Sequence, residues 1–370
     1  MQFKDVIGQQ AIKERLCKSV HEKRISHAQL LLGNTGFGTL ALALAYSQMI
    51  NCRNPLPDDS CGRCSSCAKL KQMVHPDLHF VYPTVGSKAT SADFIVEWRE
   101  ALRQNPYMNA YQWLQHIKAE NKQGNITSEE CDHIMRKLSL TSFERGYKIL
   151  LLWMPEYLGK EGNRLLKIIE EPPPNTLFLL VAENSEAIIG TILSRVQTLK
   201  VPRLLESDLQ RAIEKKNDID PESARQLAVL SEGDYNEAVK LIGGSNFDNQ
   251  QMLIKWLNAC MHKHFDQIDA TVEKLNEQGR EGQKNFIRYM LHFFRQCLLI
   301  KSVNAQQPAL SKTELLSAQK FMQRIDWQQI DQLTEQFDQA FYHIERNANA
   351  RILFFNLSIR LADAYSVGGV

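Results

Sequence analysis

Five short apolar runs in the first 200 residues constrain the fold of this chain more than any other feature of its sequence. Each run has five or six residues and lacks a regular polar alternation, which is typical of strands buried on both faces. Stretches with helical patterns lie between most of the runs. Strands that alternate with helices predict a parallel sheet with helices on both sides. The runs span residues 28–32, 78–82, 149–154, 177–182 and 197–201.

The strand signal ends at Pro202, and the rest of the chain has a helical pattern. Three short helices are expected over residues 204–243, and a longer helical region extends from about 248 to 365. The segment 243–246 (Gly-Gly-Ser-Asn) is typical of a boundary. We therefore predict three domains, over residues 1–202, 203–245 and 246–370.

Residues 84–126 are too many for a simple connection between the second and third strands. The segment contains Trp98, Tyr107, Tyr111 and Trp113, so we expect a partly helical insertion rather than a disordered linker. The sequence assigns no role to it.

Charge and composition limit the class of protein. The 370 residues carry 44 Lys and Arg against 42 Asp and Glu, a net charge of +2, which indicates neither a nucleic-acid nor a membrane protein. No apolar run approaches the ~18 residues of a membrane helix. The first residues lack the charged-then-apolar layout of a signal peptide. We expect a cytoplasmic chain, in which the eight cysteines are thiols or metal ligands rather than disulfides.

A glycine-rich loop follows the first strand and opens a helix. Gly33, Gly36 and Gly38 have the spacing of a Walker A loop, whose backbone N–H groups wrap a phosphate at a helix N-terminus. Thr39 stands where a lysine would reach the β- and γ-phosphates, and Leu40 where a hydroxyl would hold Mg²⁺. The loop is either a turn without a ligand or a degenerate ATP-binding loop, and the strand–loop–helix context favours the second.

The end of the third strand also lacks the residues of an ATPase. A P-loop ATPase carries a Mg²⁺-binding Asp there, commonly followed by a Glu that activates water. Trp153 and Met154 occupy these two positions. With the lysine, the hydroxyl and both carboxylates missing, the sequence predicts no nucleotide hydrolysis by this chain.

Four cysteines lie within 16 residues, namely Cys52, Cys61, Cys64 and Cys67. Their C-x2-C spacing allows neighbouring thiolates to reach one Zn²⁺ ion, and four protein ligands predict a structural rather than a catalytic site. The span is too short to bury an apolar core, so metal binding would supply its folding energy. The alternatives are incidental thiols or an iron–sulfur site, although the Cys-Pro that completes a ferredoxin run is missing.

The pair Ser194 and Arg195 precedes the fifth strand, at an edge that in a P-loop fold faces away from the chain's own phosphate loop. An arginine at that edge can be offered to a nucleotide on a neighbouring subunit, where such a finger accelerates hydrolysis ~10³-fold or more. The alternative is a surface arginine that caps a helix, and the residues alone favour it.

The phosphate-loop position, the cysteine module after its helix and the string 165–176 (LLKIIEEPPPNT) together resemble the AAA+ clamp-loader family of bacterial DNA polymerase III. Residues 139–148 resemble the family's lead-in to the Walker B strand. Residues 194–197 resemble its Ser-Arg-Cys motif, with Val196 in place of the cysteine. Residues 344–349 resemble the closing helix of its C-terminal collar. The resemblance covers nearly the whole chain.

The resemblance implies an α/β AAA+ domain with a zinc module at about 50–70, a small helical lid domain and an all-α collar domain. Intact Walker motifs mark the family's motor subunits, gamma and tau, so this chain resembles the delta-prime type. That type is a non-catalytic stator, which helps to load the sliding clamp on primed DNA in a hetero-pentamer with motor and delta subunits. Ser194 and Arg195 would then act in trans on a neighbour's ATP. Asn236 lies nearest the family's nucleotide-sensing arginine position.

Inner helices of clamp loaders contact DNA phosphates, which raises a DNA role for Lys160, Arg164 and Lys167. Their spacings of four and three predict one helix face. The alternative, a solvated basic face balanced by neighbouring glutamates, is favoured.

Two other functions stay open on the residues. An active ATPase of the motor type is opposed by Thr39, Leu40, Trp153 and Met154. A free-standing zinc-ribbon nucleic-acid binder would use Arg53, Arg63 and Lys69 and would confine DNA affinity to residues near 50–75.

Overall fold

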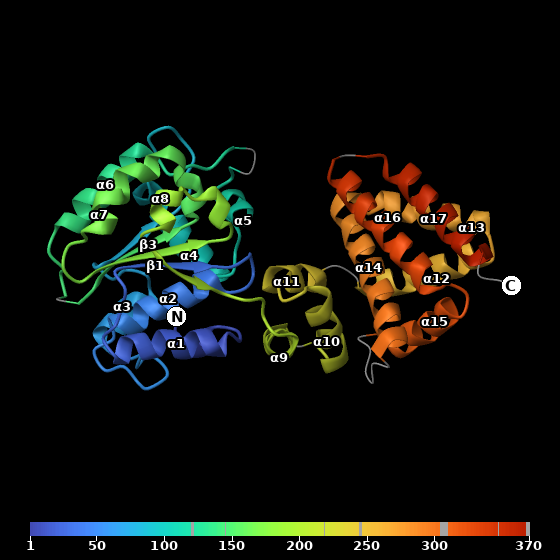
Figure 1. Cartoon of the computed structure of the whole chain (residues 1–370), viewed down its shortest axis with the longest axis horizontal. Helices are drawn as coiled ribbons and strands as arrows, with labels where there is room; N and C mark the ends of the chain where they lie inside the picture. The colour runs from blue at the N-terminus through green and yellow to red at the C-terminus, as the bar shows by residue number, and fades with distance from the viewer. Residues whose placement is uncertain are drawn as a thin grey trace. The chain divides into compact units, whose positions relative to one another are not determined.

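The computed structural model describes residues 1–119, 122–144, 146–217, 219–243, 246–303, 310–346 and 348–367. The chain forms two compact units (Figure 1). The first comprises Met1–Ala212 with Gly233–Asn236, and the second comprises Ile213–Glu232 with Glu237–Val370. The predicted division into three domains stays a prediction. Of the short motifs quoted above, Arg145, Gly244, Ser245 and Asn347 lie outside the described residues, as do residues 120 and 121 of the insertion.

A five-stranded parallel sheet forms the centre of the first unit, in the order β2-β3-β4-β1-β5. Every residue of β3 and β4 is buried, as expected for apolar strands covered on both faces. The predicted fold class, a parallel α/β domain followed by helices, is confirmed. The strands are β1 (Ala28–Leu32), β2 (Leu78–Val81), β3 (Lys148–Trp153), β4 (Thr176–Ala182) and β5 (Gln197–Lys200).

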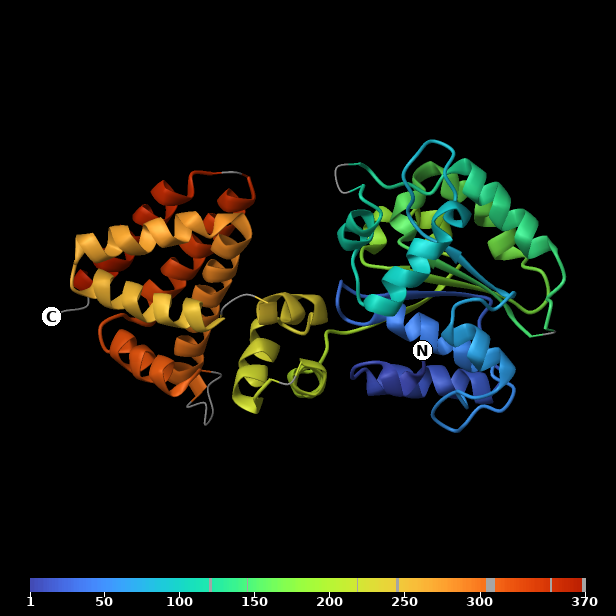
Figure 2. The same cartoon turned by 180° about the vertical axis from the view of Figure 1, so that it is seen from behind.

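Helices cover both faces of this sheet (Figures 1 and 2). On one face, Ile134 of α6, Leu165 of η3 and Ile192 of α8 pack in one cluster with Leu150 and Phe178 of the sheet. The other face is covered by α2, which is buried along almost its whole length, and α1 packs on α2. These elements are η1 (Phe3–Asp5), α1 (Gln10–His21), α2 (Thr39–Ile50), α3 (Ser65–Lys71), α6 (Ser128–Ser139), η3 (Pro155–Leu165), α7 (Leu166–Glu170), η4 (Ser185–Ala187) and α8 (Gly190–Leu193).

Residues 84–126 leave the sheet after β2 and return beside η3. Thr84 pairs with Asn125 in an antiparallel bridge at the base of this excursion. Trp98 is buried and stacks on Tyr82, the residue directly after β2, with ring centroids 4.1 Å apart. Aromatic packing of this kind anchors the insertion to the β2–β3 side of the sheet. The insertion contains η2 (Ser91–Phe94), α4 (Ile95–Gln104) and α5 (Ala110–His116).

In the described part of the chain, all elements after β5 are helices. Three of them, α9 (Glu206–Asn217), α10 (Pro221–Leu230) and α11 (Tyr235–Gly243), correspond to the three short helices predicted over 204–243. Asp220 caps α10, and its side chain accepts hydrogen bonds from the backbone of Glu222 and Ser223. Pro221 therefore sits at the first helical position, which suits its missing N–H.

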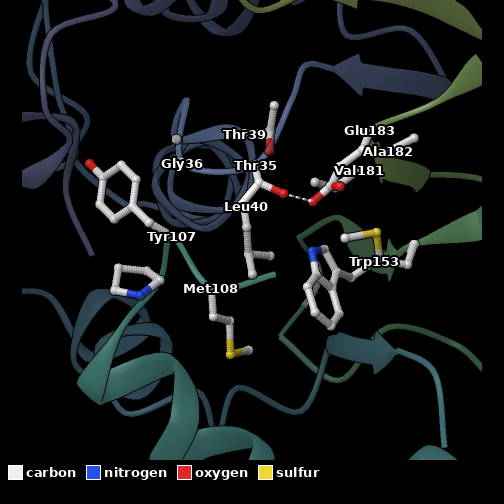
Figure 3. Close-up of a pocket in the computed structure, with 13 residues that line it drawn as sticks. Thr35, Gly36, Thr39, Leu40, Tyr107, Met108, Trp153, Val181, Ala182 and Glu183 are labelled. Carbon is white, nitrogen blue, oxygen red and sulfur yellow. Dashed lines mark hydrogen bonds between the residues drawn. The ribbon is translucent and has the colours of Figure 1, made fainter. Parts of the chain in front are cut away.

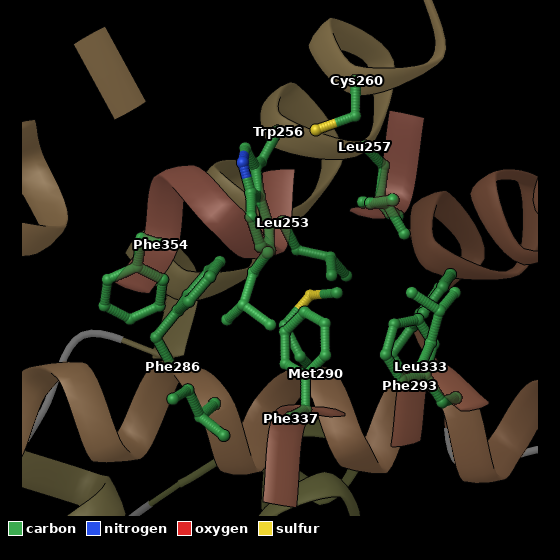
Figure 4. Packing of buried hydrophobic residues seen from close by; sticks show 14 of the residues in the cluster. Leu253, Trp256, Leu257, Cys260, Phe286, Met290, Phe293, Leu333, Phe337 and Phe354 are labelled. Carbon is green, nitrogen blue, oxygen red and sulfur yellow. The ribbon is translucent and has the colours of Figure 1, made fainter. Parts of the chain in front are cut away.

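The second unit packs its long helices around an aromatic core (Figure 4). Trp256, Phe286, Phe337 and Phe354 meet there, all of them buried. An apolar stripe of α16 supplies part of this core, through Ile330, Leu333, Phe337 and Ile344. No helix in the described part of the chain is long and apolar enough to cross a membrane. The remaining helices are α12 (Asn246–Met261), α13 (Phe265–Glu277), α14 (Gly279–Val303), α15 (Lys312–Met322), α16 (Trp327–Glu345) and α17 (Ala350–Val367).

Candidate functional site

The glycine-rich loop has the backbone path of a phosphate loop. It joins the end of β1 to α2, which begins at Thr39. Gly36 and Gly38 have φ angles of 75° and 91°, a region that residues with a Cβ rarely adopt. The backbone N–H of Gly33 is already used, because it donates to the carbonyl of Ala182 in the neighbouring strand. The spacing therefore predicts the turn, and the N–H of Gly33 is not available to a ligand.

Apolar side chains fill the space over this loop (Figure 3). Leu40 from α2, Trp153 from the end of β3 and Met108 from the insertion converge there, and each is at most 6% exposed. The space left is about 10 Å³. That is about the room one water molecule needs, so a nucleotide could enter this space only if these side chains moved.

Residues 233–236, which belong to the first unit, also pack on the phosphate loop. The N–H of Tyr235 donates to the carbonyl of Gly36 at 3.2 Å. A Cβ on Gly36 would lie 1.8 Å from Asp234 Oδ1, so this approach depends on the glycine. Asn236, the residue nearest the sensor position, donates to the carbonyl of Tyr107 and accepts from Asn105 at 2.8 Å. The insertion and this segment are thus joined over the phosphate loop.

Two carboxylates that the sequence reasoning left unassigned lie at the same edge of the sheet. Glu183, directly after β4, accepts a hydrogen bond from Thr35, and burial raises the pKa of its carboxyl group. Glu156 accepts from the backbone N–H of Glu183 and Asn184 at 2.7 and 2.9 Å. Their position could have been inferred, because the carboxyl ends of parallel strands meet at one edge. Both are engaged by the chain's own groups.

The structure brings Cys52, Cys61, Cys64 and Cys67 together. Their four sulfur atoms all lie within 4.8 Å of one another, and those of Cys61 and Cys67 are 4.0 Å apart. Four sulfurs at ~2.3 Å from one tetrahedral ion would be ~3.8 Å apart, so the set fits a metal ion of that kind.

Backbone N–H groups surround these sulfur atoms. The N–H groups of Cys61, Cys64 and Cys67 point at the sulfurs of Cys52, Cys61 and Cys64, at 3.2–3.4 Å. Backbone hydrogen bonds from Arg63 and Cys64 lower the pKa of Cys61 to about 6. Hydrogen bonds of this kind favour the thiolate, which is the form that binds metal.

Charged residues from distant parts of the chain hold this cysteine module in place. The carboxylate of Asp59 accepts hydrogen bonds from the backbone of Phe3 and Lys4, at 3.0 and 3.1 Å. Glu144 pairs with Lys69 and lies 3.5 Å from the ring of His75. The sequence reasoning missed these supports, because their partners are 50 or more residues away.

Ser194 and Arg195 follow the short helix α8. Arg195 has an ion pair with Glu170, the last residue of α7. It also donates to the carbonyl of Thr191 at 2.8 Å and to the hydroxyl of Ser194 at 3.2 Å. The Arg195 side chain is 31% exposed. Its place on the surface agrees with both interpretations given by the sequence, a helix-capping arginine and a trans-acting one.

The three basic residues assigned to a DNA contact lie on two helices rather than on one. Lys160 and Arg164 belong to the 3-10 helix η3, which is kinked at Gly159, and Lys167 belongs to α7. Arg164 is paired with Glu161 and Asp132, at 2.8 and 3.4 Å. Among the described residues, neither lysine has an ion pair, and all three residues are exposed. The single α-helix expected from their spacing is instead a 3-10 helix that runs directly into α7, and the DNA contact stays a prediction.

A comparison with protein families finds one matching model, described as DNA polymerase III, delta subunit, over residues 8–204. The match takes in the whole sheet, the phosphate loop and the cysteine module, more than half of the chain. This chain belongs to that family.

The curated relatives carry several subunit names. The tau subunit of Bacillus subtilis is 23% identical over 85% of this chain and 53% of its own length. The delta' subunit of the same organism is 25% identical over 69% of this chain and 65% of its own. The delta' subunit of Haemophilus influenzae is 24% identical, with 85% and 72% covered. The chain therefore spans less than two thirds of the first two relatives, and identity does not separate the delta' from the tau type.

Proposed function

We propose that this chain is a non-catalytic, delta-prime-type subunit of a DNA polymerase III clamp loader, and that it assembles with motor (gamma or tau) and delta subunits in a hetero-pentamer. In that assembly it would act as a stator, helping to load the sliding clamp on primed DNA during replication in the cytoplasm. The observation that carries the proposal is the phosphate loop, which keeps its glycines but is filled by Leu40, Met108 and Trp153.

The chemistry of that loop supports a subunit without ATPase activity. Hydrolysis needs groups that neutralise the charge developing on the phosphates, and a lysine and Mg²⁺ usually do so. Thr39 and Leu40 offer neither, and Trp153 and Met154 replace the metal-binding carboxylates. Relatives named gamma and tau match as well as those named delta', so the distinction rests on these residues.

Zn²⁺ is the ion we propose for the cysteine module. Its four ligands would be Cys52, Cys61, Cys64 and Cys67, which supply a complete set of thiolates. The ion would replace the apolar core that this short segment lacks. Because no position is left for water or substrate, its role would be structural.

Arg195 is the residue we propose to act outside its own chain. It lies on the surface beside Ser194, and its guanidinium would be offered to ATP bound by the adjacent motor subunit. In the same assembly the exposed lysines Lys160 and Lys167 would lie close to DNA phosphates. Each lysine removed would then lower the salt slope of DNA binding by about one unit.

Two measurements on the purified full-length chain test the proposal. Calorimetric titration with Mg·ATP should give no saturable binding up to millimolar concentration, whereas micromolar affinity with turnover would favour the motor-type alternative. Mass measurement after mixing with motor and delta subunits should give a single larger complex. A chain that stays monomeric beside them would exclude the stator role.

A further inference from the structure

The guanidinium of Arg195 is bound on every nitrogen by its own chain. Nε donates to Glu170 Oε1 at 2.7 Å, and one terminal nitrogen pairs with the same oxygen. The other terminal nitrogen donates to the carbonyl of Thr191 and to the hydroxyl of Ser194. Since Ser194 itself donates to the Thr191 carbonyl at 3.1 Å, the group is held in one arrangement.

Few N–H groups of Arg195 are left for a ligand from outside the chain. A guanidinium has five N–H groups; three of them donate hydrogen bonds here, and a fourth belongs to the terminal nitrogen that forms the ion pair with Glu170. Bidentate capture of a phosphate needs two parallel N–H groups on one edge. One N–H is left, so Arg195 cannot grip a phosphate in this way without giving up a bond to its own chain.

Glu170 is the partner that an incoming phosphate can replace. Its carboxylate occupies the edge formed by Nε and one terminal nitrogen, and phosphate is the equivalent anionic acceptor for that edge. The Glu170 side chain is 48% exposed, so the carboxylate can turn into water when it is displaced. The carbonyl of Thr191, in contrast, is fixed in α8.

We propose that Glu170 holds Arg195 in an inhibited position, bound to its own chain, and that Arg195 binds a neighbouring subunit's ATP only when a phosphate oxygen displaces Glu170. The proposal rests on the trans-acting role proposed above for Arg195. The ion pair between Glu170 and Arg195 is therefore inhibitory, and its strength sets how readily Arg195 becomes available to a neighbouring subunit. Ion pairs as exposed as this one shift an equilibrium by about five-fold at most, so bound ATP can overcome it.

The experiment compares Glu170→Gln with Glu171→Gln in the full-length chain, assembled with motor and delta subunits. Glu171 is the adjacent exposed carboxylate, and among the described residues it has no ion pair, so the two variants change charge equally. Glu170→Gln should raise the rate of ATP hydrolysis about two- to five-fold, while Glu171→Gln leaves it unchanged. The gain should vanish in a Glu170→Gln, Arg195→Ala double variant. An unchanged or lower rate in Glu170→Gln would overturn the proposal.

A second readout needs no hydrolysis. Phenylglyoxal modifies accessible arginines, and the extent at Arg195 can be followed by mass spectrometry of the full-length chain. Modification of Arg195 should be faster in Glu170→Gln than in Glu171→Gln. Equal rates would contradict the claim that Glu170 holds Arg195 in the inhibited position.

The single variant Arg195→Ala separates failure of this inference from failure of the proposed function. If Arg195→Ala leaves hydrolysis by the assembly unchanged, the trans-acting role itself is wrong. If Arg195→Ala lowers hydrolysis but Glu170→Gln does not raise it, only the inhibitory role of Glu170 is wrong.

Discussion

The phosphate loop and the cysteine module lie in the same unit, and both have motifs typical of a bound ligand. The loop keeps the backbone path of its motif, but apolar side chains occupy the space where a ligand would lie. The cysteine module keeps all four donor atoms within 4.8 Å, and charged residues from elsewhere support it. The difference shows that a motif's backbone and its chemistry can be separated. Glycine spacing predicts a turn, whereas donor atoms decide whether the turn binds anything.

The largest expected effect comes from removing a donor of the cysteine module. Cys64→Ser should lose the bound metal and several kcal/mol of stability, because metal binding supplies the folding energy of the segment. Metal per chain, measured by elemental analysis, and urea unfolding check this. Cys131→Ala, which changes a buried cysteine of α6, serves as the matched control and should keep the metal. Full metal content in Cys64→Ser would contradict the assignment of the ligands.

The filled phosphate loop should respond as a hydrophobic core does. Trp153 is 2% exposed, so Trp153→Ala should lower the free energy of unfolding by about 3–5 kcal/mol. Urea denaturation measures the change. Phe143→Ala removes an aromatic side chain that is 78% exposed and should change stability by less than about 0.5 kcal/mol. Equal effects of the two variants would show that the pocket is not part of the core.

The sheet beside the cysteine module should be sensitive to pH. Burial, with a smaller contribution from Lys137, lowers the pKa of His79 on β2 to about 4, from an ordinary value of 6.5. The unfolded chain therefore binds this proton more readily, and the stabilisation present above pH 6.5 is lost as the pH falls from 6.5 towards 4. We expect a loss of about 1–3 kcal/mol in the free energy of unfolding over that range.

Unfolding measured at several pH values, in the wild type and in His79→Leu, checks this expectation. The variant should have a flatter pH profile between 4 and 6.5. His262→Gln removes an exposed imidazole and controls for the loss of a histidine. An identical profile in wild type and His79→Leu would exclude His79 as the source.

The smallest expected effect is on nucleotide binding when the Walker lysine is restored. Thr39→Lys returns one missing group, but Met108 and Trp153 still fill the space and Mg²⁺ still lacks its ligands. We expect no detectable Mg·ATP binding by calorimetry. Micromolar binding in Thr39→Lys would mean that the missing lysine prevents ATP binding, and that the packed side chains do not.

The sequence predicted the sheet because its central strands β3 and β4 are apolar on both faces, as Leu150 and Phe178 illustrate. The edge strand β5 differs from the expected buried strand, since only Leu199 of its four residues is buried. It predicted the cysteine cluster because the ligands are close in the chain. It did not predict that Met108 and Asn236 close the phosphate loop, since such long-range contacts leave no local signal. It also placed 160–167 on one α-helix, whereas residues up to Leu165 form the 3-10 helix η3 and α7 begins at Leu166, a change that the periodicity of so short a segment does not reveal.

The hydrolysis rate of an assembly that contains Arg195→Ala tests the central claim most directly. The variant chain, mixed with motor and delta subunits in the presence of clamp and primed DNA, should assemble normally but hydrolyse ATP at least ten-fold more slowly, because the neighbour's site loses its arginine. Arg136→Ala, another exposed arginine of the first unit, should behave as the wild type. A rate equal to wild type in Arg195→Ala would contradict the claim that this chain completes a neighbour's ATP site.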